Sequence, residues 1–149
     1  MIEGIELLIE EQVDIINMSM GDEYKYHKEI EEVCRAATEK GILIVAAYSN
    51  QKAEATYPAS FPFVMGVRCL DMENPVQVLQ YDEKKNDVIF SCELFFLYHL
   101  GIPVLHPGNS LACAVVTGYL SNYEKQYQQA ILQFTLNTLN NYYPYQTLK

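Results

Sequence analysis

Basic residues are scarce in this sequence of 149 amino acids. Lys and Arg together number 10, against 19 Asp and Glu, so the formal net charge is -9 at pH 7. A protein surface that binds the phosphates of nucleic acids needs clustered Lys and Arg. The few basic residues are scattered along the chain, and we therefore expect no nucleic-acid partner.

The sequence also has no long apolar run and no basic N-terminal segment. A transmembrane helix needs ~20 consecutive apolar residues, and no run approaches this length although hydrophobic residues make up 50% of the chain. The first residues, MIEGIELLIEEQ, carry acidic side chains where a secretory signal peptide carries basic ones. We expect a globular, cytoplasmic protein that is not attached to a membrane.

The sequence also lacks Cys, His and acidic residues at the spacing of a metal site. The four cysteines form no Cys-x-x-Cys pair, and together with the three histidines they give no zinc pattern. The acidic residues that could bind calcium are not clustered. We predict no metal and no cofactor, and we expect cysteines in apolar runs to be small buried side chains. The residues considered are Cys34, Cys69, Cys92, Cys113, His27, His99, His106, Asp22, Glu23, Asp71 and Glu73.

The apolar residues that are present follow alternating helical and strand patterns. Helical spacing predicts amphipathic helices, and short runs that are apolar on both faces predict buried strands of a parallel sheet. The predicted helices are 2–12, 25–40, one that starts near 110, and 124–140; the predicted strands are 13–18, 42–47 and 63–69. This order is typical of an α/β fold. Residues 72–105 give no firm prediction.

The apolar spacing also predicts which residues of the helices face inward. In the helix 25–40, apolar residues recur at i, i+3, i+4 and i+7, and Gly41 follows where a C-terminal cap belongs. The expected inward residues are Ile30, Val33, Cys34 and Ala37 in this helix, and Ala112, Val115, Val116 and Tyr119 in the helix that starts near 110.

Four segments carry more specific motifs. They are GIELLIEEQVDIINMSMG at 4–21, GILIVAAYSN at 41–50, YPASFPFVMGVRCLD at 57–71 and GNSLACAVVTGYL at 108–120. In this order and spacing they resemble the C-terminal half of a subtilisin-like serine protease of the subtilase family. The resemblance implies an α/β fold with a partial subtilisin-like parallel sheet and flanking helices. It also implies that residues 1–149 form a single partial subtilase domain.

The resemblance assigns roles to five residues. Ser110 matches the nucleophile in the family pattern Gly-Thr-Ser-x-Ala-x-Pro, and Asn50 matches the asparagine that donates a side-chain N–H to the oxyanion. Ser19, Met20 and Gly21 match the edge of the substrate cleft, which pairs with a bound peptide as an added strand. Four positions depart from the family pattern: Asn109 replaces threonine, Ala114 replaces proline, and Tyr48 and Ser49 replace two small residues.

Two parts of the family's catalytic machinery are not found in the sequence. Acyl transfer from a serine needs a base for the hydroxyl proton, and in this family the triad runs Asp, His, Ser along the chain. No Asp-Ser/Thr-Gly or His-Gly-Thr signature occurs here. We therefore expect the Ser-bearing subunit of a split serine endopeptidase, inactive alone and completed by a partner chain that carries the N-terminal half. Its substrate would be a peptide or protein that undergoes limited processing.

The sequence leaves two other functions open. A non-catalytic pseudoenzyme or scaffold would bind an extended peptide at the cleft edge while Ser110 stays idle. A stand-alone hydrolase would use His106, four residues before the serine, as its base. A truncated or degenerate gene product would also account for the missing half. In the split arrangement, we expect strand 13–18 to lie at the cut with an unpaired edge.

Overall fold

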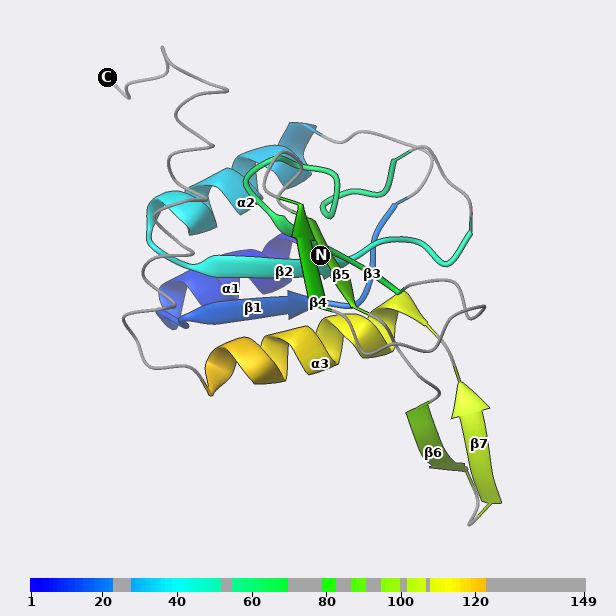
Figure 1. Cartoon of the computed structure of the whole chain (residues 1–149). Helices are drawn as coiled ribbons and strands as arrows, with labels where there is room; N and C mark the ends of the chain where they lie inside the picture. The colour runs from blue at the N-terminus through cyan, green and yellow to red at the C-terminus, as the bar shows by residue number, and fades with distance from the viewer. Residues whose placement is uncertain are drawn as a thin grey trace, which may run out of the picture.

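The described part of the chain forms a layered α/β structure (Figure 1). The computed structural model describes residues 1–22, 28–51, 55–69, 79–82, 87–90, 95–99, 102–106 and 108–122. The helices are α1 (Ile2–Glu10), α2 (Lys28–Glu39) and α3 (Asn109–Ser121). The strands are β1 (Ile15–Met18), β2 (Leu43–Ala47), β3 (Met65–Cys69), β4 (Leu79–Asp82), β5 (Asp87–Phe90), β6 (Phe95–His99) and β7 (Ile102–His106).

The main sheet has five strands in the order β1-β2-β3-β5-β4. Strands β1, β2, β3 and β5 run parallel, and β4 pairs antiparallel with β5 at the far edge. The predicted α/β class with a parallel sheet is therefore confirmed, whereas the antiparallel strand within the polar segment 72–88 was not predicted. Strands β6 and β7 form a separate antiparallel pair below the sheet in Figure 1.

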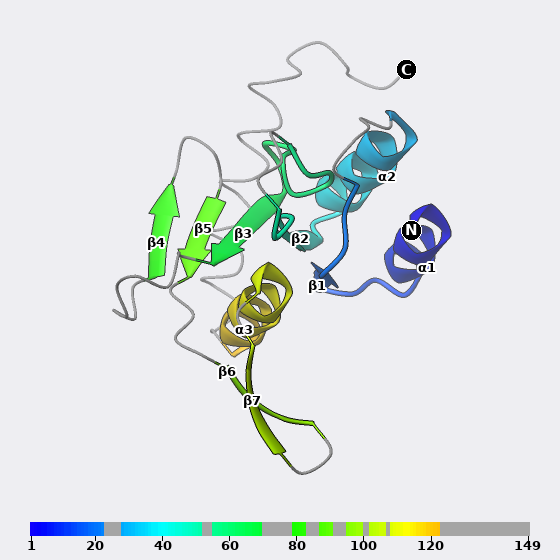
Figure 2. The ribbon, with the colours of Figure 1, turned by 90° about the vertical axis from the view of Figure 1, so that its right-hand side faces the viewer.

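Helices cover both faces of this sheet, with α1 and α2 on one side and α3 on the other (Figure 2). Strand β2 lies between these layers, and all five of its residues are buried. Successive side chains of a strand point to opposite faces, so Ile44 and Ala46 pack toward α1 and α2. Leu43 and Val45 pack toward α3 in a second cluster. The run at 42–47 is thus continuously apolar because both faces of the strand are buried.

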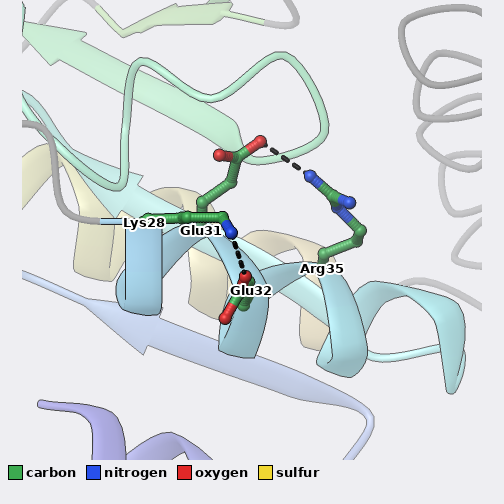
Figure 3. Close-up of polar contacts among 4 residues, drawn as sticks. All are labelled: Lys28, Glu31, Glu32 and Arg35. Carbon is green, nitrogen blue, oxygen red and sulfur yellow. Dashed lines mark hydrogen bonds and ion pairs between the residues drawn. The ribbon is translucent and has the colours of Figure 1, made fainter. Parts of the chain in front are cut away.

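Helix α2 has the buried face that its sequence predicts. Its four expected inward residues are buried, and Gly41 takes a positive φ of 86° directly after the helix. The polar side carries ion pairs at i, i+4 spacing (Figure 3). Arg35 lies 2.8 Å from the carboxylate of Glu31, and Lys28 lies 3.2 Å from that of Glu32. The second pair is exposed and contributes little to stability.

Helix α3 differs from its prediction. Its buried stripe consists of Ala112, Cys113, Val116 and Leu120, which pack on β2 and β3. Two residues expected on the inward face, Val115 and Tyr119, are 37% and 53% exposed. The predicted helix 124–140 lies outside the described residues. No helix among those described is long and apolar enough to cross a membrane.

Candidate functional site

Ser110 lies in the first turn of α3. Gly108 precedes the helix, and its carbonyl oxygen accepts from the N–H groups of Leu111 and Ala112, each at 3.1 Å. The backbone N–H groups of a first helical turn have no partner within the helix, and the helix dipole favours negative charge there. Among the described residues no acceptor binds the Ser110 N–H. This group is therefore available to an anionic oxygen of a ligand.

The side chain of Ser110 faces the end of β1. Its Oγ donates to the carbonyl oxygen of Ser19 at 3.2 Å. The Oγ of Ser19 lies 3.2 Å both from the carbonyl oxygen of Ser110 and from Oδ1 of Asn17, and it can donate to either. This pairing holds the candidate nucleophile against the predicted cleft edge. A backbone carbonyl cannot accept the proton permanently, so Ser19 is no general base.

Asn50 follows β2 and is fixed by one hydrogen bond. Its Oδ1 accepts from the backbone N–H of Asn109 at 2.8 Å. Because the oxygen is engaged, the amide nitrogen Nδ2 is left to donate elsewhere, and no described residue accepts from it. Asn50 and Ser110 therefore each present an N–H group without a described partner, as an oxyanion site requires.

The side chain of Asn109 joins α3 to the sheet. Its Nδ2 donates to the carbonyl oxygens of Tyr48 and Ser49 at 3.0 and 2.7 Å, and its Oδ1 accepts from the N–H of Cys69 at 2.7 Å. Asn109 is 8% exposed. The departure from the family's threonine thus supplies an amide that binds the ends of both β2 and β3.

Replacing Asn109 by Ala is expected to lower the free energy of unfolding by about 2–4 kcal/mol, because buried backbone groups at the ends of β2 and β3 lose their partners. Urea unfolding followed by circular dichroism measures this change. Asn109→Thr is the matched control: it restores the family residue but offers one hydroxyl in place of three bonds, so its loss should be smaller. Equal stability of Asn109→Ala and the parent would contradict the assignment.

All five residues singled out in the sequence line one cavity of about 330 Å³. The tip of β1 forms one wall and the end of β2 the other. The lining residues are Ser19, Met20, Gly21, Ala47, Tyr48, Ser49, Asn50, Gln51, Thr56 and Ser110. The structure thus brings the predicted residues together, while their catalytic roles remain predictions. The sequence argument missed Thr56, although this residue directly precedes the Tyr-Pro-Ala motif.

A backbone bridge holds the cleft edge in place. Asp22 and Tyr57 form an antiparallel bridge, in which each N–H donates to the other's carbonyl oxygen at 2.9 Å. A Cβ atom added to Gly21 would lie 2.7 Å from Cγ2 of Thr56 and 2.8 Å from the carbonyl oxygen of Tyr57. Only glycine therefore lets the edge approach this segment so closely.

Two cysteines are buried close to the sheet. Burial raises the pKa of the Cys113 thiol to about 11 and that of Cys34 to about 12. The Cys113 Sγ lies 3.5 Å from the carbonyl oxygen of Val45 and 3.5 Å from Nδ2 of Asn17. These two thiols fit the prediction of small buried side chains, and Cys69 is half-buried. Cys92 lies outside the described residues.

We expect thiol reagents at about pH 8 to leave Cys34 and Cys113 unmodified in the folded chain, because the thiolate is the reactive form. Peptide mapping after iodoacetamide treatment, with and without urea, checks this. The raised pKa values also imply that stability falls above pH 9.0, the ordinary thiol value, where only the unfolded thiols ionise. Rapid labelling of Cys113 in the folded chain would contradict this expectation.

Most of the remaining sequence candidates, Glu23, Asp71 and Glu73 among them, lie outside the described residues. Among the described residues, no group of three His, Cys, Asp or Glu side chains could hold a metal ion. His27 lies outside the described residues, and so do the side chains of His99 and His106. The hypothesis that His106 serves as a local base therefore stays a prediction.

Comparisons with known proteins agree with this fold. The Subtilase family matches residues 1–142. The chain is 29% identical over 94 residues to the "Major intracellular serine protease" of Bacillus subtilis (strain 168), a match that covers 59% of this chain and 29% of that protein. The chain thus spans less than a third of the length of this curated relative.

Solved structures share the fold at low sequence identity. The self-cleaved protease domain of PatA matches with a TM-score of 0.63 and 22% identity, covering 80% of this chain and 48% of that one. Fervidolysin from Fervidobacterium pennivorans matches with a TM-score of 0.65 and 18% identity, covering 88% and 23%. The PatG macrocyclase in complex with peptide matches with a TM-score of 0.63 and 18% identity, covering 94% and 41%. The fold is that of subtilisin-like proteases, and the chain belongs to the subtilase family.

Proposed function

We propose that this chain is the Ser-bearing subunit of a split subtilisin-like serine endopeptidase. The observation that carries the proposal is that Ser110 and Asn50 line one cavity, and that neither the Ser110 N–H nor Nδ2 of Asn50 has a described acceptor. Ser110 Oγ would attack the substrate carbonyl carbon, and the two N–H donors would stabilise the resulting oxyanion. The backbone groups of Ser19, Met20 and Gly21 would pair with the extended peptide beside Ser110.

The proposal requires a base from outside the described residues. Ser110 Oγ donates to the Ser19 carbonyl, and no described His or carboxylate side chain hydrogen-bonds to it. We assign the base to a histidine, oriented by an aspartate, on a partner chain that carries the N-terminal subtilase half. When that histidine accepts the proton, the hydroxyl would exchange its bond to Ser19 for a bond to the imidazole.

The outer edge of β1 suits such a partner. Among the described strands, β1 pairs only with β2, so its outer edge can accept another strand. At the C-terminal end of β1, the apolar side chain of Met20 is 62% exposed. A strand of the partner that pairs with β1 would bond to the backbone groups of this edge. It would also bring its C-terminal end next to Ser19 and Ser110, if it ran parallel to β1.

The test combines a fluorophosphonate probe with intact-mass measurement. The Ser110 oxygen would form a bond to phosphorus while fluoride leaves, so each labelled chain gains the mass of the phosphonyl group. We expect labelling of the chain when it is co-purified with its partner, no labelling of the chain alone, and none of Ser110→Ala in either state. Labelling of the isolated chain that His106→Ala abolishes would instead support the stand-alone hydrolase.

A second function, a non-catalytic peptide-binding scaffold, is favoured by one observation. The hydroxyl of Ser110 is engaged with a backbone carbonyl and is exposed on the cleft wall, an arrangement that also suits an idle serine. Under this alternative, a captured partner would leave Ser110 unlabelled, and Ser110→Ala would bind peptide as tightly as the parent chain.

The setting proposed for the enzyme is limited processing of a peptide in the cytoplasm. The match to a Bacillus protease described as intracellular supports this location. Detection of the chain in the cytosolic fraction together with its partner is the corresponding measurement.

A further inference from the structure

A side-chain amide joins the edge strand β1 to α3, outside the cavity described above. Asn17 lies on β1 and pairs in parallel register with Val45 of β2. Val45 packs toward α3, and paired residues of neighbouring strands point to the same face of a sheet, so Asn17 also points toward α3. Its Nδ2 lies 2.7 Å from Oγ1 of Thr117 and 3.5 Å from Sγ of Cys113.

The hydrogen bonds around Thr117 fix the orientation of this amide. The Thr117 hydroxyl donates to the carbonyl oxygen of Cys113 at 2.9 Å. Because its one proton is used in this bond, the hydroxyl oxygen accepts from Nδ2 of Asn17. Oδ1 of Asn17 then faces the cleft edge, where it lies 3.2 Å from Oγ of Ser19. The amide thus connects the middle of α3 with the tip of β1.

Helix α3 is attached to β1 at two levels. At its first turn, the Ser110 hydroxyl donates to the carbonyl oxygen of Ser19 at 3.2 Å. One to two turns later, Nδ2 of Asn17 contacts Cys113 and Thr117, which are four residues apart and lie on the same side of the helix. A helix that is held at two levels can neither slide along the strand nor pivot about one contact.

The attachment to β1 complements the one to the other strands of the site. Asn109 bonds the start of α3 to the ends of β2 and β3. Strand β1 carries the cleft edge but pairs with β2 alone among the described strands, so its position relative to Ser110 depends on its own contacts with α3. The polar contacts of Asn17 supply this link without touching the cavity, since Asn17 is not among its lining residues.

We infer that Asn17 is a positioning residue, which sets the distance between Ser110 on α3 and the cleft edge on β1. The inference deepens the proposed function and rests on it, because this distance governs turnover only if the Ser110 oxygen attacks a peptide held at that edge. A misplacement of about 1 Å at a reacting group lowers a rate by about 10²-fold.

Replacing Asn17 by Ala is therefore expected to lower kcat of the assembled complex by about 10- to 100-fold. KM should stay within about 3-fold of the parent value, because Asn17 contributes no group to the cavity wall. Hydrolysis of an internally quenched peptide measures both constants. Asn17 is exposed on the edge strand that the partner would cover, so the assay is run at a partner concentration that saturates the activity.

Thr117 offers a matched pair of substitutions. Thr117→Ser keeps the hydroxyl that accepts from Asn17 and should retain most of the parent kcat. Thr117→Val keeps the branched shape but removes this acceptor, and it should lower kcat in the same direction as Asn17→Ala. Combining Asn17→Ala with Thr117→Val should cost no more than the larger single loss, because both changes remove the same contact.

A second measurement needs neither turnover nor partner. Hydrogen exchange followed by mass spectrometry on the full chain compares peptides from α3 with peptides from α2. We expect Asn17→Ala to accelerate exchange of the α3 amides by at least about 10-fold through local opening and to leave those of α2 unchanged. A residue that served only overall stability would accelerate both helices alike.

Four results would overturn the inference: a raised KM with unchanged kcat, equal kcat of Thr117→Ser and Thr117→Val, additive losses in the double variant, or equal acceleration of exchange in α3 and α2. If the parent complex hydrolyses no peptide, the proposed protease is rejected and hydrogen exchange alone decides the role of Asn17. Acceleration confined to α3 would then support the placement of Ser110 by Asn17, and unchanged exchange would reject it. If Asn17→Ala does not fold, the two Thr117 variants decide by the same measurements.

Discussion

Replacing Ser110 by Ala is expected to lower peptide hydrolysis by the assembled complex by about 10⁶-fold in turnover, the figure measured when the triad serine of subtilisin is removed. The substitution removes the atom that forms the acyl bond. It should change the free energy of unfolding by about 1 kcal/mol or less, because the hydroxyl makes one exposed hydrogen bond, to the carbonyl oxygen of Ser19. Steady-state hydrolysis of an internally quenched peptide measures the loss, and urea unfolding measures the stability.

Ser19→Ala provides the matched control for this experiment. It deletes the other hydroxyl of the reciprocal pair but keeps the Ser19 carbonyl to which Ser110 donates. The complex should then retain most of its turnover. If Ser110→Ala and Ser19→Ala reduce hydrolysis equally, the pair acts only to hold the cleft edge, and the assignment of Ser110 as nucleophile is wrong.

The central layers of the fold could be predicted because burial leaves a local pattern in the sequence. In α2 the apolar residues repeat with the helical period, and each of them packs on the sheet. In β2 a continuous apolar run reflects contact with helices on both sides. The antiparallel strand β4 lies at the sheet edge within a polar segment, and its sequence Leu-Gln-Tyr-Asp shows no such apolar run.

Helix α3 shows where this reasoning fails. Its residues are apolar on several sides, so periodicity alone could not indicate which side faces the sheet. Packing on β2 and β3 selects the stripe through Cys113 and Leu120 and leaves Val115 exposed. A helix that is apolar all round is usually covered all round. Contacts among the described residues therefore leave the apolar side of α3 that carries Val115 and Tyr119 uncovered.

In the candidate site, too, some features could be predicted from the sequence and others could not. Ser110 and Asn50 could be identified as candidates because each lies in a short motif within one segment of the chain. The contacts of Asn109 could not be predicted, since they join residues 40 to 61 positions apart. The close approach of Thr56 to Gly21 could not be predicted either, because no local sequence pattern indicates such a distance.

Replacing Asn50 by Ala is expected to reduce turnover of the complex by about 10²–10³-fold, the effect of removing one oxyanion donor in subtilisin. The same substitution removes the 2.8 Å bond that holds the start of α3, so a misplaced Ser110 could also lower the rate. Asn50→Asp separates these causes. Aspartate keeps an oxygen acceptor for the Asn109 N–H and places a negative charge at a helix N-terminus, which favours folding. However, it replaces the Nδ2 donor by an oxygen that repels the oxyanion. If the donor matters, Asn50→Asp should be stable and at least as inactive as Asn50→Ala in the quenched-peptide assay. Recovery of turnover in Asn50→Asp would instead mean that Asn50 serves only to position the helix.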